Sequence, residues 1–455
     1  MTMIDTKLLE KVVYNLCLQA GQELSPYSYN IISKAYKETH SLRLAHILQN
    51  AKKAHEISRP LCQDTGTVHI FMEVGNEVSF SSNPTDAINE GVKKCYVEKY
   101  FRKSVVENEF ISGQNRETNT PALINVDYVS GDNVKINVLL KGAGCDNVSE
   151  IKMMLPTTSE KEFVSFAANT ILEKGKNACP PVFVSIAAGT GAESVMLEAE
   201  KGYFSDKTDL PELVEKIKAE VKEKADKKYE GFYLADLKIT AKPHHMASLP
   251  VAIAFNCHSL RIASATICGK NVSYSEKISE FEEIKEEKIS EKEVSTFDLE
   301  AVKNLKEGEN VLLSGEILIA RDAAHKKMME YKLSGIPLPF ELKDQFVFYA
   351  APCPAMPDEI VGSIGPTTSN RMDKFLPEFP QVAATLGKGG RSAEAADFIR
   401  KNNSVYFEIE GGIATLLSSC FESYETVAFE ELSTEAVCRA KINKLPAKVV
   451  FAKQN

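Results

Sequence analysis

Three cysteines that lie far apart in the chain place the strongest constraint on how it can fold. Cys62 lies in Arg59-Pro-Leu-Cys-Gln-Asp-Thr-Gly66, Cys179 in Asn177-Ala-Cys-Pro-Pro181 and Cys257 in Phe255-Asn-Cys-His258. None belongs to a Cys-x-x-Cys pair, so the close ligand spacing of structural zinc sites is missing. Three distant thiolates that folding brings together suit an iron–sulfur cluster in which one iron lacks a protein ligand. Spacing alone favours three unrelated buried thiols, because cysteine packs like a small hydrophobic residue.

Length, charge and cysteine usage indicate a multidomain cytoplasmic protein. A chain of 455 residues is about three times the usual length of one domain, so we expect two or three domains. The formal net charge of -9 disfavours a nucleic-acid partner, and no stretch approaches the roughly 20 apolar residues of a membrane span. The N-terminus lacks an apolar signal core, and the ten dispersed cysteines are typical of reduced thiols.

A charged stretch divides the chain. Between Ser275 and Glu300 the sequence is rich in Glu and Lys and has few large apolar residues, as expected of a surface connection between domains. We therefore predict an N-terminal domain over residues 1–280, a linker over 281–300 and a C-terminal domain over 301–455. The predicted fold class is α+β, with helices and strands mixed in the first domain and a smaller, β-rich second domain.

Hydrophobic periodicity predicts the elements that carry the motifs. Helices are expected over the first 55 residues and over 85–103, 160–173, 192–202 and 207–229. Strands are expected over 68–74, 121–127, 134–140, 181–187, 249–256, 262–267, 310–319, 345–351, 404–409 and 414–417. The strands 121–127 and 134–140 are expected to pair around the turn Ser130-Gly-Asp-Asn133.

Cations in polar turns predict a site for an anion. The turn from Gly362 to Asp373 combines threonine hydroxyls with Arg371, whose guanidinium can hold both oxygens of a carboxylate. Arg321 follows an apolar run, the loop from Gly387 to Arg391 carries two cations, and Lys141-Gly-Ala-Gly144 is similar to a backbone nest for an anion. Each motif also has an ordinary interpretation as a surface turn or loop.

Asp64 and His245 are candidates for proton transfer. Asp64 stands two residues after Cys62, and a carboxylate beside a metal site of low dielectric can serve as an acid or a base. His245, in His244-His-Met-Ala-Ser-Leu-Pro250, would more often be a satisfied core or surface histidine.

Together these motifs resemble the iron–sulfur-dependent (class I) fumarate hydratase family. Its members carry Cys-Gln-Asp-Thr-Gly, Ala-Cys-Pro-Pro, Asn/Ser-Cys-His/Ser, Arg-Asp-x-Ala-His and Gly-Pro-Thr-Thr-Ser-Gly-Arg-Met-Asp. The corresponding segments occur here in the same order, at 62–66, 178–181, 256–258, 321–325 and 365–373. The resemblance covers nearly the whole chain, and the combination is highly specific.

The resemblance implies a cofactor and a set of site residues. The cofactor is a [4Fe-4S] cluster held by Cys62, Cys179 and Cys257, whose open iron acts as a Lewis acid. The implied contacts to a dicarboxylate substrate are Gln63, Asp64, Arg102, Gly142, Ala143, Gly144, Arg321, Thr367, Arg371 and Lys388. Thr367 matches the proposed base and Asp64 the proposed acid, and His245 matches an active-site histidine.

The implied activity is the interconversion of fumarate and (S)-malate by an oxygen-sensitive hydro-lyase of the tricarboxylic acid cycle. Tartrate dehydration or mesaconate hydration by a similar site is one alternative, and an iron–sulfur sensor without turnover is another. The resemblance further implies a fusion of two parts that are separate subunits in some relatives. It also implies a swivelling β/β/α C-terminal domain, an active site between the domains, and a homodimer.

Two positions depart from the family pattern. Gly142-Ala-Gly-Cys145 stands where Gly-Gly-Gly-Ser is expected, so an additional thiol is predicted near the substrate. Cys145 is either a conservative replacement of Ser or a thiol that competes for the open iron and changes oxygen sensitivity. Asn370 stands where the family often has Gly, and Asn can replace Gly in left-handed backbone.

Overall fold

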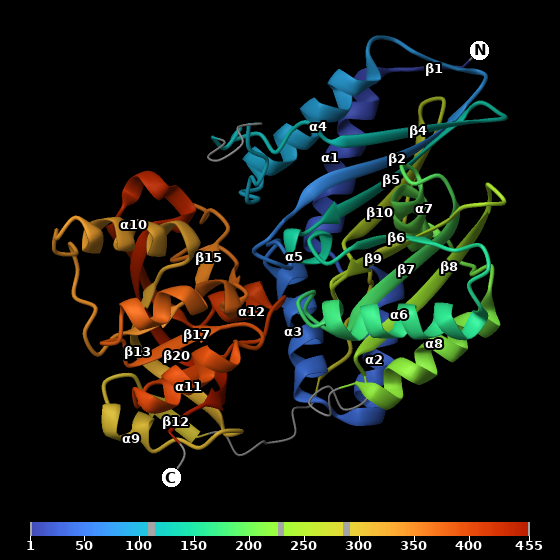
Figure 1. The fold of residues 1–455 in the computed structure, drawn as a ribbon. Coiled ribbons are helices and arrows are strands. Elements are labelled where there is room, and N and C mark those ends of the chain that lie inside the picture. Colours follow the sequence, from blue (N-terminus) through green and yellow to red (C-terminus); the bar gives the residue numbers. More distant parts are fainter. Residues whose placement is uncertain (1, 108–113, 226–231, 285–291, 454–455) are drawn as a thin grey trace. The chain divides into compact units, whose positions relative to one another are not determined.

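The computed structural model describes residues 2–107, 114–225, 232–284 and 292–453 (Figure 1). The chain divides into two compact units, and each mixes helices with strands. The first unit comprises residues 1–58 and 64–284, and the second comprises residues 59–63 and 285–455. The segment Arg59–Gln63, which carries Cys62, therefore belongs by its contacts to the second unit.

The first unit holds two main sheets. Its helices are α1 (Thr6–Gln22), α2 (Pro26–Thr39), α3 (Leu42–Glu56), α4 (Pro84–Glu98), α5 (Ala143–Asp146), α6 (Glu160–Gly175), α7 (Val195–Lys201), η1 (Gly202–Phe204) and α8 (Pro211–Lys224). Its strands are β1 (Thr2–Ile4), β2 (Thr67–Gly75), β3 (Val78–Phe80), β4 (Leu123–Val129), β5 (Asn133–Lys141), β6 (Glu150–Met154), β7 (Val182–Thr190), β8 (Leu234–His244), β9 (Leu249–Asn256), β10 (Ile262–Cys268) and β11 (Asn271–Tyr274). One sheet has the strand order β11-β10-β5-β2-β4 and the other β6-β9-β7-β8.

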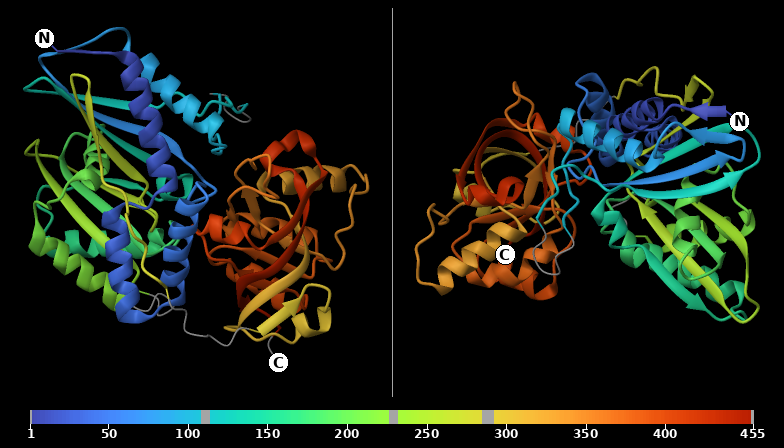
Figure 2. Two further views of the ribbon diagram at one scale, coloured as in Figure 1. Left: turned by 180° about the vertical axis from the view of Figure 1, so that it is seen from behind. Right: turned by 90° about the horizontal axis from the view of Figure 1, so that it is seen from above.

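Helices cover the outer faces of both sheets (Figures 1 and 2). Helix α1 begins after Asp5, whose carboxylate caps it at the amide of Lys7, and its apolar stripe at Leu9, Val13 and Leu16 packs with α4 on β2, β5 and β10. Helices α6 and α8 pack on the four-stranded sheet. Apolar residues of α7 and η1 pack between residues of the two sheets. The loop of Cys179 precedes β7 and that of Cys257 follows β9, so the four-stranded sheet positions both.

The pairing expected for the strands on either side of Ser130 is wrong. Strands β4 and β5 do form, but β2 lies between them, parallel to β4 and antiparallel to β5. Strand β2 is buried along most of its length and takes the inner position, whereas β4 is largely exposed. Burial of apolar side chains therefore outweighs the short connection between β4 and β5. The predicted helix over 207–229 ends at Lys224, and residues 226–229 lie outside the described part of the chain.

The second unit is built around a ring of strands. Its strands are β12 (Lys292–Ser295), β13 (Asn310–Ile319), β14 (Phe346–Phe348), β15 (Ala350–Pro352), β16 (Ile364–Pro366), β17 (Ala384–Gly387), β18 (Val405–Glu408), β19 (Phe421–Ala428) and β20 (Val437–Phe451). Its helices are α9 (Leu299–Lys303), α10 (Asp322–Leu333), η3 (Ser369–Glu378), α11 (Ala393–Lys401), α12 (Ala414–Ser418) and η4 (Glu430–Glu435). Strand β13 pairs with β14 and with β20, so β13, β14, β17, β18 and β20 close a ring.

The structure differs from three predictions for the second unit. The strand expected over 414–417 is the helix α12, because a short apolar run fits either structure. Of the predicted linker, residues 285–291 lie outside the described chain, while residues 292–295 form β12, which pairs with β13. Asn370 lies in the 3₁₀ helix η3, so it does not adopt the left-handed backbone considered for it.

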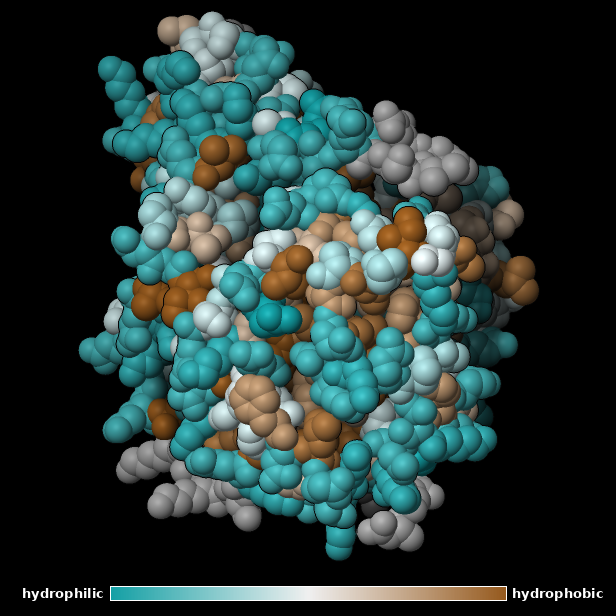
Figure 3. All heavy atoms as spheres, turned by 90° about the vertical axis from the view of Figure 1, so that its left-hand side faces the viewer, coloured by the Kyte–Doolittle hydropathy of each residue, from teal (hydrophilic) through white to brown (hydrophobic). Residues whose placement is uncertain are grey.

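Polar residues dominate the face of the molecule shown in Figure 3, with hydrophobic residues in small groups between them. Within the described ranges, no helix is both long and apolar enough to cross a membrane.

Candidate active site

Two of the three cysteine motifs meet at one end of the central strands, β7 and β9, of the four-stranded sheet. Cys257 follows the end of β9, and Cys179 precedes the start of β7. These strands are antiparallel and pair Phe183 with Asn256, so the start of one lies beside the end of the other. A ring nitrogen of His258 lies 3.1 Å from the carbonyl oxygen of Cys179 and links the two loops. The sheet register thus joins segments that are 78 positions apart in the sequence.

A third thiol, that of Cys145 in α5, joins this place. The sulfur of Cys145 lies 3.9 Å from the carbonyl oxygen of Ala178, and the Cys145 thiol contacts that of Cys257. The hydrogen bond from Cys145 holds the pKa of Cys257 well below its ordinary value, and it raises the pKa of Cys145. Cys257 is therefore disposed to be a thiolate, the form of cysteine that binds metals. Cys145 thus lies beside a predicted ligand, and its position near the substrate stays a prediction.

Cys62 is held by the second unit. Arg59 forms an ion pair of 2.9 Å with Glu359, and the carbonyl oxygen of Pro60 accepts hydrogen bonds from Ser363 and Thr415. The buried Cys62 thiol lies 3.3 Å from the amide oxygen of Gln63. The predicted ligands therefore divide into Cys179 and Cys257 in the first unit and Cys62 in the second. Across the described residues, no group of three or more His, Cys, Asp or Glu side chains is arranged to hold a metal ion.

Asp64 is fixed by backbone donors in the first unit. One carboxylate oxygen accepts from the amide of Ala143 over 2.9 Å, and the other accepts from the amide of Gly66 over 3.2 Å. Gly66 has φ +75°, and a Cβ there would lie 2.5 Å from the carbonyl oxygen of Lys141. Only glycine allows the two chain segments to approach this closely. The structure therefore brings Asp64 to the predicted turn from Gly142 to Gly144.

Arg102 lies near the same turn, whereas His245 does not. The carbonyl oxygen of Arg102 accepts a hydrogen bond of 2.7 Å from Thr65, the neighbour of Asp64. His245 is exposed in the connection from β8 to β9. It lies at the opposite end of β9 from Cys257, and the eight residues of that strand span roughly 26 Å at about 3.3 Å each. Within one chain, the predicted histidine is thus separated from the other site residues of its unit.

In the second unit, the backbone aligns Gln63, Thr367 and Lys388. The buried Gln63 amide donates to the carbonyl oxygen of Pro366 over 3.4 Å. The next residue, Thr367, donates from its amide to Tyr349 and accepts at its carbonyl from the amide of Lys388 over 3.0 Å. A polar turn is therefore held along a ladder of hydrogen bonds beside β15 and β17.

Arg321 and Arg371 converge on one carboxylate. Oδ2 of Asp322 lies 2.8 Å from Arg371 and 3.3 Å from Arg321, and Arg321 also contacts Glu435 at 3.2 Å. The side chain of Arg321 is 12% exposed and that of Arg371 is 46% exposed. The two predicted anion-binding residues thus come within reach of the same oxygen atom, although 50 positions separate them in the sequence.

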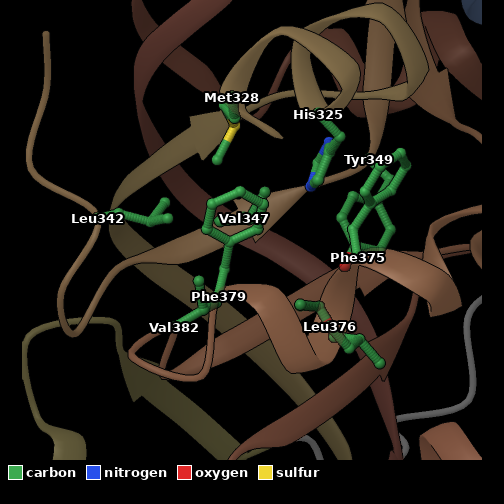
Figure 4. A pocket seen from close by; sticks show the side chains of 10 residues that line it. His325, Met328, Leu342, Val347, Tyr349, Phe375, Leu376, Phe379 and Val382 are labelled. Carbon is green, nitrogen blue, oxygen red and sulfur yellow. The ribbon is translucent and has the colours of Figure 1, made fainter. Parts of the chain in front are cut away.

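His325 supports Arg321 from an apolar pocket (Figure 4). Its Nδ1 atom lies 2.9 Å from the carbonyl oxygen of Arg321, and its ring packs 5.4 Å from Tyr349 and from Phe375. Burial lowers the pKa of His325 to about 4, so the ring is neutral at neutral pH. A neutral ring that donates from Nδ1 fixes the backbone from which the Arg321 side chain extends.

Comparison with known proteins assigns the family. The family model described as "Fumarate hydratase (Fumerase)" matches residues 10–266, and the model described as "Fumarase C-terminus" matches residues 269–455. The chain belongs to the fumarate hydratase family. The predicted membership, with its hydro-lyase class, is confirmed. The two matched regions meet within one chain, as expected of a fusion.

Three relatives are each about 29% identical to this chain over the aligned residues. The aerobic class I fumarate hydratase of Escherichia coli K12 is 29% identical over 439 residues, which cover 88% of this chain and 79% of the relative. Fumarate hydratase 1, mitochondrial, from Leishmania major is 29% identical over 445 residues, or 89% and 80% of the two chains. A putative L(+)-tartrate dehydratase subunit alpha from Methanocaldococcus jannaschii is 29% identical over 275 residues, or 56% of this chain and 96% of the subunit.

Several charged residues of this fumarate hydratase family member escaped the sequence analysis. Lys141 is fully buried and forms an ion pair of 3.0 Å with Glu200, which also binds His69 at 2.8 Å. Burial opposes ionisation of Glu200, but the hydrogen bond from His69 and the charge of Lys141 outweigh it and lower its pKa to about 2. Lys141 directly precedes the turn at Gly142, so this buried network anchors the turn. In the sequence Lys141 is only the first residue of a glycine-rich segment, and nothing near it points to Glu200.

Proposed function

We propose that the protein catalyses the reversible hydration of fumarate to (S)-malate. The observation that carries this proposal is the convergence of Arg321 and Arg371 on a single carboxylate oxygen of Asp322. Two guanidinium groups that can reach one carboxylate oxygen are suited to bind a carboxylate of a small diacid. The family assignment supports the same activity, because the relatives named above include fumarate hydratases.

We propose a [4Fe-4S] cluster held by Cys62, Cys179 and Cys257. Two of the three donors support this proposal, since the loops of Cys179 and Cys257 adjoin and cysteine thiolates are the usual ligands of iron–sulfur clusters. When bound, the cluster supplies an open iron that acts as a Lewis acid toward a substrate oxygen.

The chain's own residues then bind the diacid and move its protons. The carboxylates are held by Arg102, Arg321, Arg371 and Lys388. The charges of these residues stabilise the aci-carboxylate that forms when malate loses a proton from the CH₂ carbon, which is α to one carboxylate and does not carry the hydroxyl group. Thr367 handles the proton at that carbon, helped by the neighbouring cations because a hydroxyl is a weak base. Asp64 holds the proton exchanged with the hydroxyl oxygen of malate. Gln63 and Asp64 are consecutive in the chain and belong to different units, so the proposed residue set draws on both.

The proposed role of His245 requires a second copy of the chain. It is exposed, and β9 separates it from Cys257 within one chain. We propose that the protein is a homodimer in which His245 of each copy serves the site of the other. A cytoplasmic location, oxygen sensitivity, a place in the tricarboxylic acid cycle and a swivelling C-terminal domain stay predictions from the resemblance.

A second candidate is the dehydration of tartrate. It is favoured by the match between this chain and a protein named as a putative tartrate dehydratase subunit. Mesaconate hydration requires the same diacid contacts and differs by a methyl group. An iron–sulfur sensor would need the thiolates but not the cations around Thr367.

One comparison tests these functions. Anaerobically reconstituted protein is assayed with fumarate, tartrate and mesaconate, before and after exposure to air. Turnover that is fastest with fumarate and lost in air supports the proposal. Faster turnover of tartrate or mesaconate would reassign the substrate, and a loaded cluster without turnover of any of these acids would favour the sensor.

A further inference from the structure

We propose that Arg261 is a positioning residue of this site, which fixes the proposed acid Asp64 against the turn at Gly142. The inference rests on the proposed function. Arg261 stands between the Cys257 loop and β10, and it is 3% exposed. A guanidinium is seldom buried to this degree unless its donors are used.

The first observation is a direct contact with Asp64. Nη1 of Arg261 donates to the backbone carbonyl oxygen of Asp64. The carbonyl oxygen of Arg261 accepts from the amide of Leu140 over 3.0 Å, which ties Arg261 to the end of β5. Asp64 is therefore held at its carbonyl by Arg261 and at its carboxylate by the amides of Ala143 and Gly66.

The second observation concerns Gly142. A Cβ at this position would lie 2.8 Å from Nη2 of Arg261 and 3.2 Å from Oδ2 of Asp64. The turn thus leaves room for the guanidinium and the carboxylate side by side. The planar guanidinium can direct separate donors at two neighbours from one position, whereas the ammonium of lysine is a single point of charge. Arg261 therefore sets the distance between the Asp64 segment and the turn.

The role predicts a loss of turnover without a loss of folding. Arg261→Gln and Arg261→Lys are prepared in the full chain, reconstituted anaerobically and assayed with fumarate. We expect kcat to fall about 100-fold in Arg261→Gln, as misplacement of a reacting group by about 1 Å can do. We expect KM to change by less than about threefold, because the carboxylate-binding arginines are unchanged, and Arg261→Lys to recover part of kcat. Iron content and the midpoint of thermal unfolding should match the wild type. The same is expected of the control Arg400→Gln on α11, where the guanidinium of the wild type pairs with Glu307.

Gly142→Ala supplies a second, independent perturbation of the same contact. If both changes displace Asp64, the double variant Arg261→Gln/Gly142→Ala should lose much less activity than the product of the two single losses. Additive losses, or a kcat of Arg261→Gln equal to that of the wild type, would overturn the role. So would a fall in iron content or unfolding midpoint that accounts for the lost activity. If Arg261→Gln does not fold, the same measurements of kcat, iron content and unfolding midpoint are made on Arg261→Lys, on Gly142→Ala and on the double variant of these two. Wild-type protein that binds iron but does not turn over fumarate would refute the proposed function itself.

Discussion

The carboxylate of Asp64 accepts a hydrogen bond of 2.9 Å from the backbone amide of Ala143. The glycine-rich turn that the sequence suggested as a nest for an anion therefore directs at least one amide to a carboxylate of the protein itself. This contact makes the turn a support for the proposed acid, and the contact of the turn with the substrate stays a prediction.

Asp64→Asn should remove proton transfer and leave the fold intact. The amide group has one acceptor oxygen, so it can keep only one of the bonds to Ala143 and Gly66, and it cannot exchange a proton. We expect kcat for fumarate hydration to fall at least about 100-fold. The control is Asp206→Asn, on the exposed surface of the same unit. Near-normal turnover of Asp64→Asn would exclude Asp64 as the acid.

Arg371→Lys should weaken substrate binding more than it slows turnover. Lysine keeps the charge but loses the planar pair of donors that can hold a carboxylate. We expect KM for fumarate to rise about tenfold, equivalent to about 1.4 kcal/mol. Arg400→Lys serves as the matched control. An unchanged KM would show that Arg371 does not contact the substrate.

His325 should make the folding of the protein sensitive to acid. Its pKa is lowered to about 4 by burial from an ordinary value of 6.5, so between these values the unfolded state binds a proton that the folded state does not. Stability should therefore fall as the pH decreases through this range, by about 2 kcal/mol between pH 7 and pH 5.

Urea unfolding at the two pH values measures this effect. His325→Gln should show a loss between pH 7 and pH 5 that is smaller by this amount, whereas His40→Asn, at an exposed left-handed position that Asn tolerates, should behave as the wild type. Equal pH dependence in His325→Gln and the wild type would contradict the prediction.

Cys145→Ser should change the sensitivity of the protein to air. The Cys145 thiol contacts Cys257, so a peroxide could join the two sulfurs in a disulfide, with the two protons and two electrons reducing the peroxide to water. Serine cannot form this bond, and we expect slower inactivation. Mass spectrometry of the oxidised wild type should find the linked peptides. The control is Cys268→Ser, whose thiol is exposed. Equal rates in Cys145→Ser and the wild type would end the idea.

Local sequence patterns predicted the bounds of an element well where its own residues determine how it is buried. The bounds expected for β9 and β13 agree with the structure, because β9 is almost entirely buried and buried residues alternate along the first part of β13. The order of β4, β2 and β5 could not be inferred, since it depends on which strand buries more surface against α1 and α4. The same limit applies to Glu200, Asp322 and Arg261. Each of these side chains contacts a residue that is distant in the sequence. Only the fold determines the distance between the two partners.

The exposed position of His245 leads to a test of the proposed exchange between two copies. His245→Asn and Thr367→Ala should each abolish turnover. In a mixed dimer, one site would combine an intact Thr367 with an intact His245 from the other copy, while the second site would carry both changes. A purified mixed dimer should therefore have about half of the wild-type activity. A site completed within one chain would contain one defect in every copy and recover nothing. Co-expression of the two variants with different affinity tags, followed by purification through both tags and an anaerobic fumarate assay, separates these outcomes.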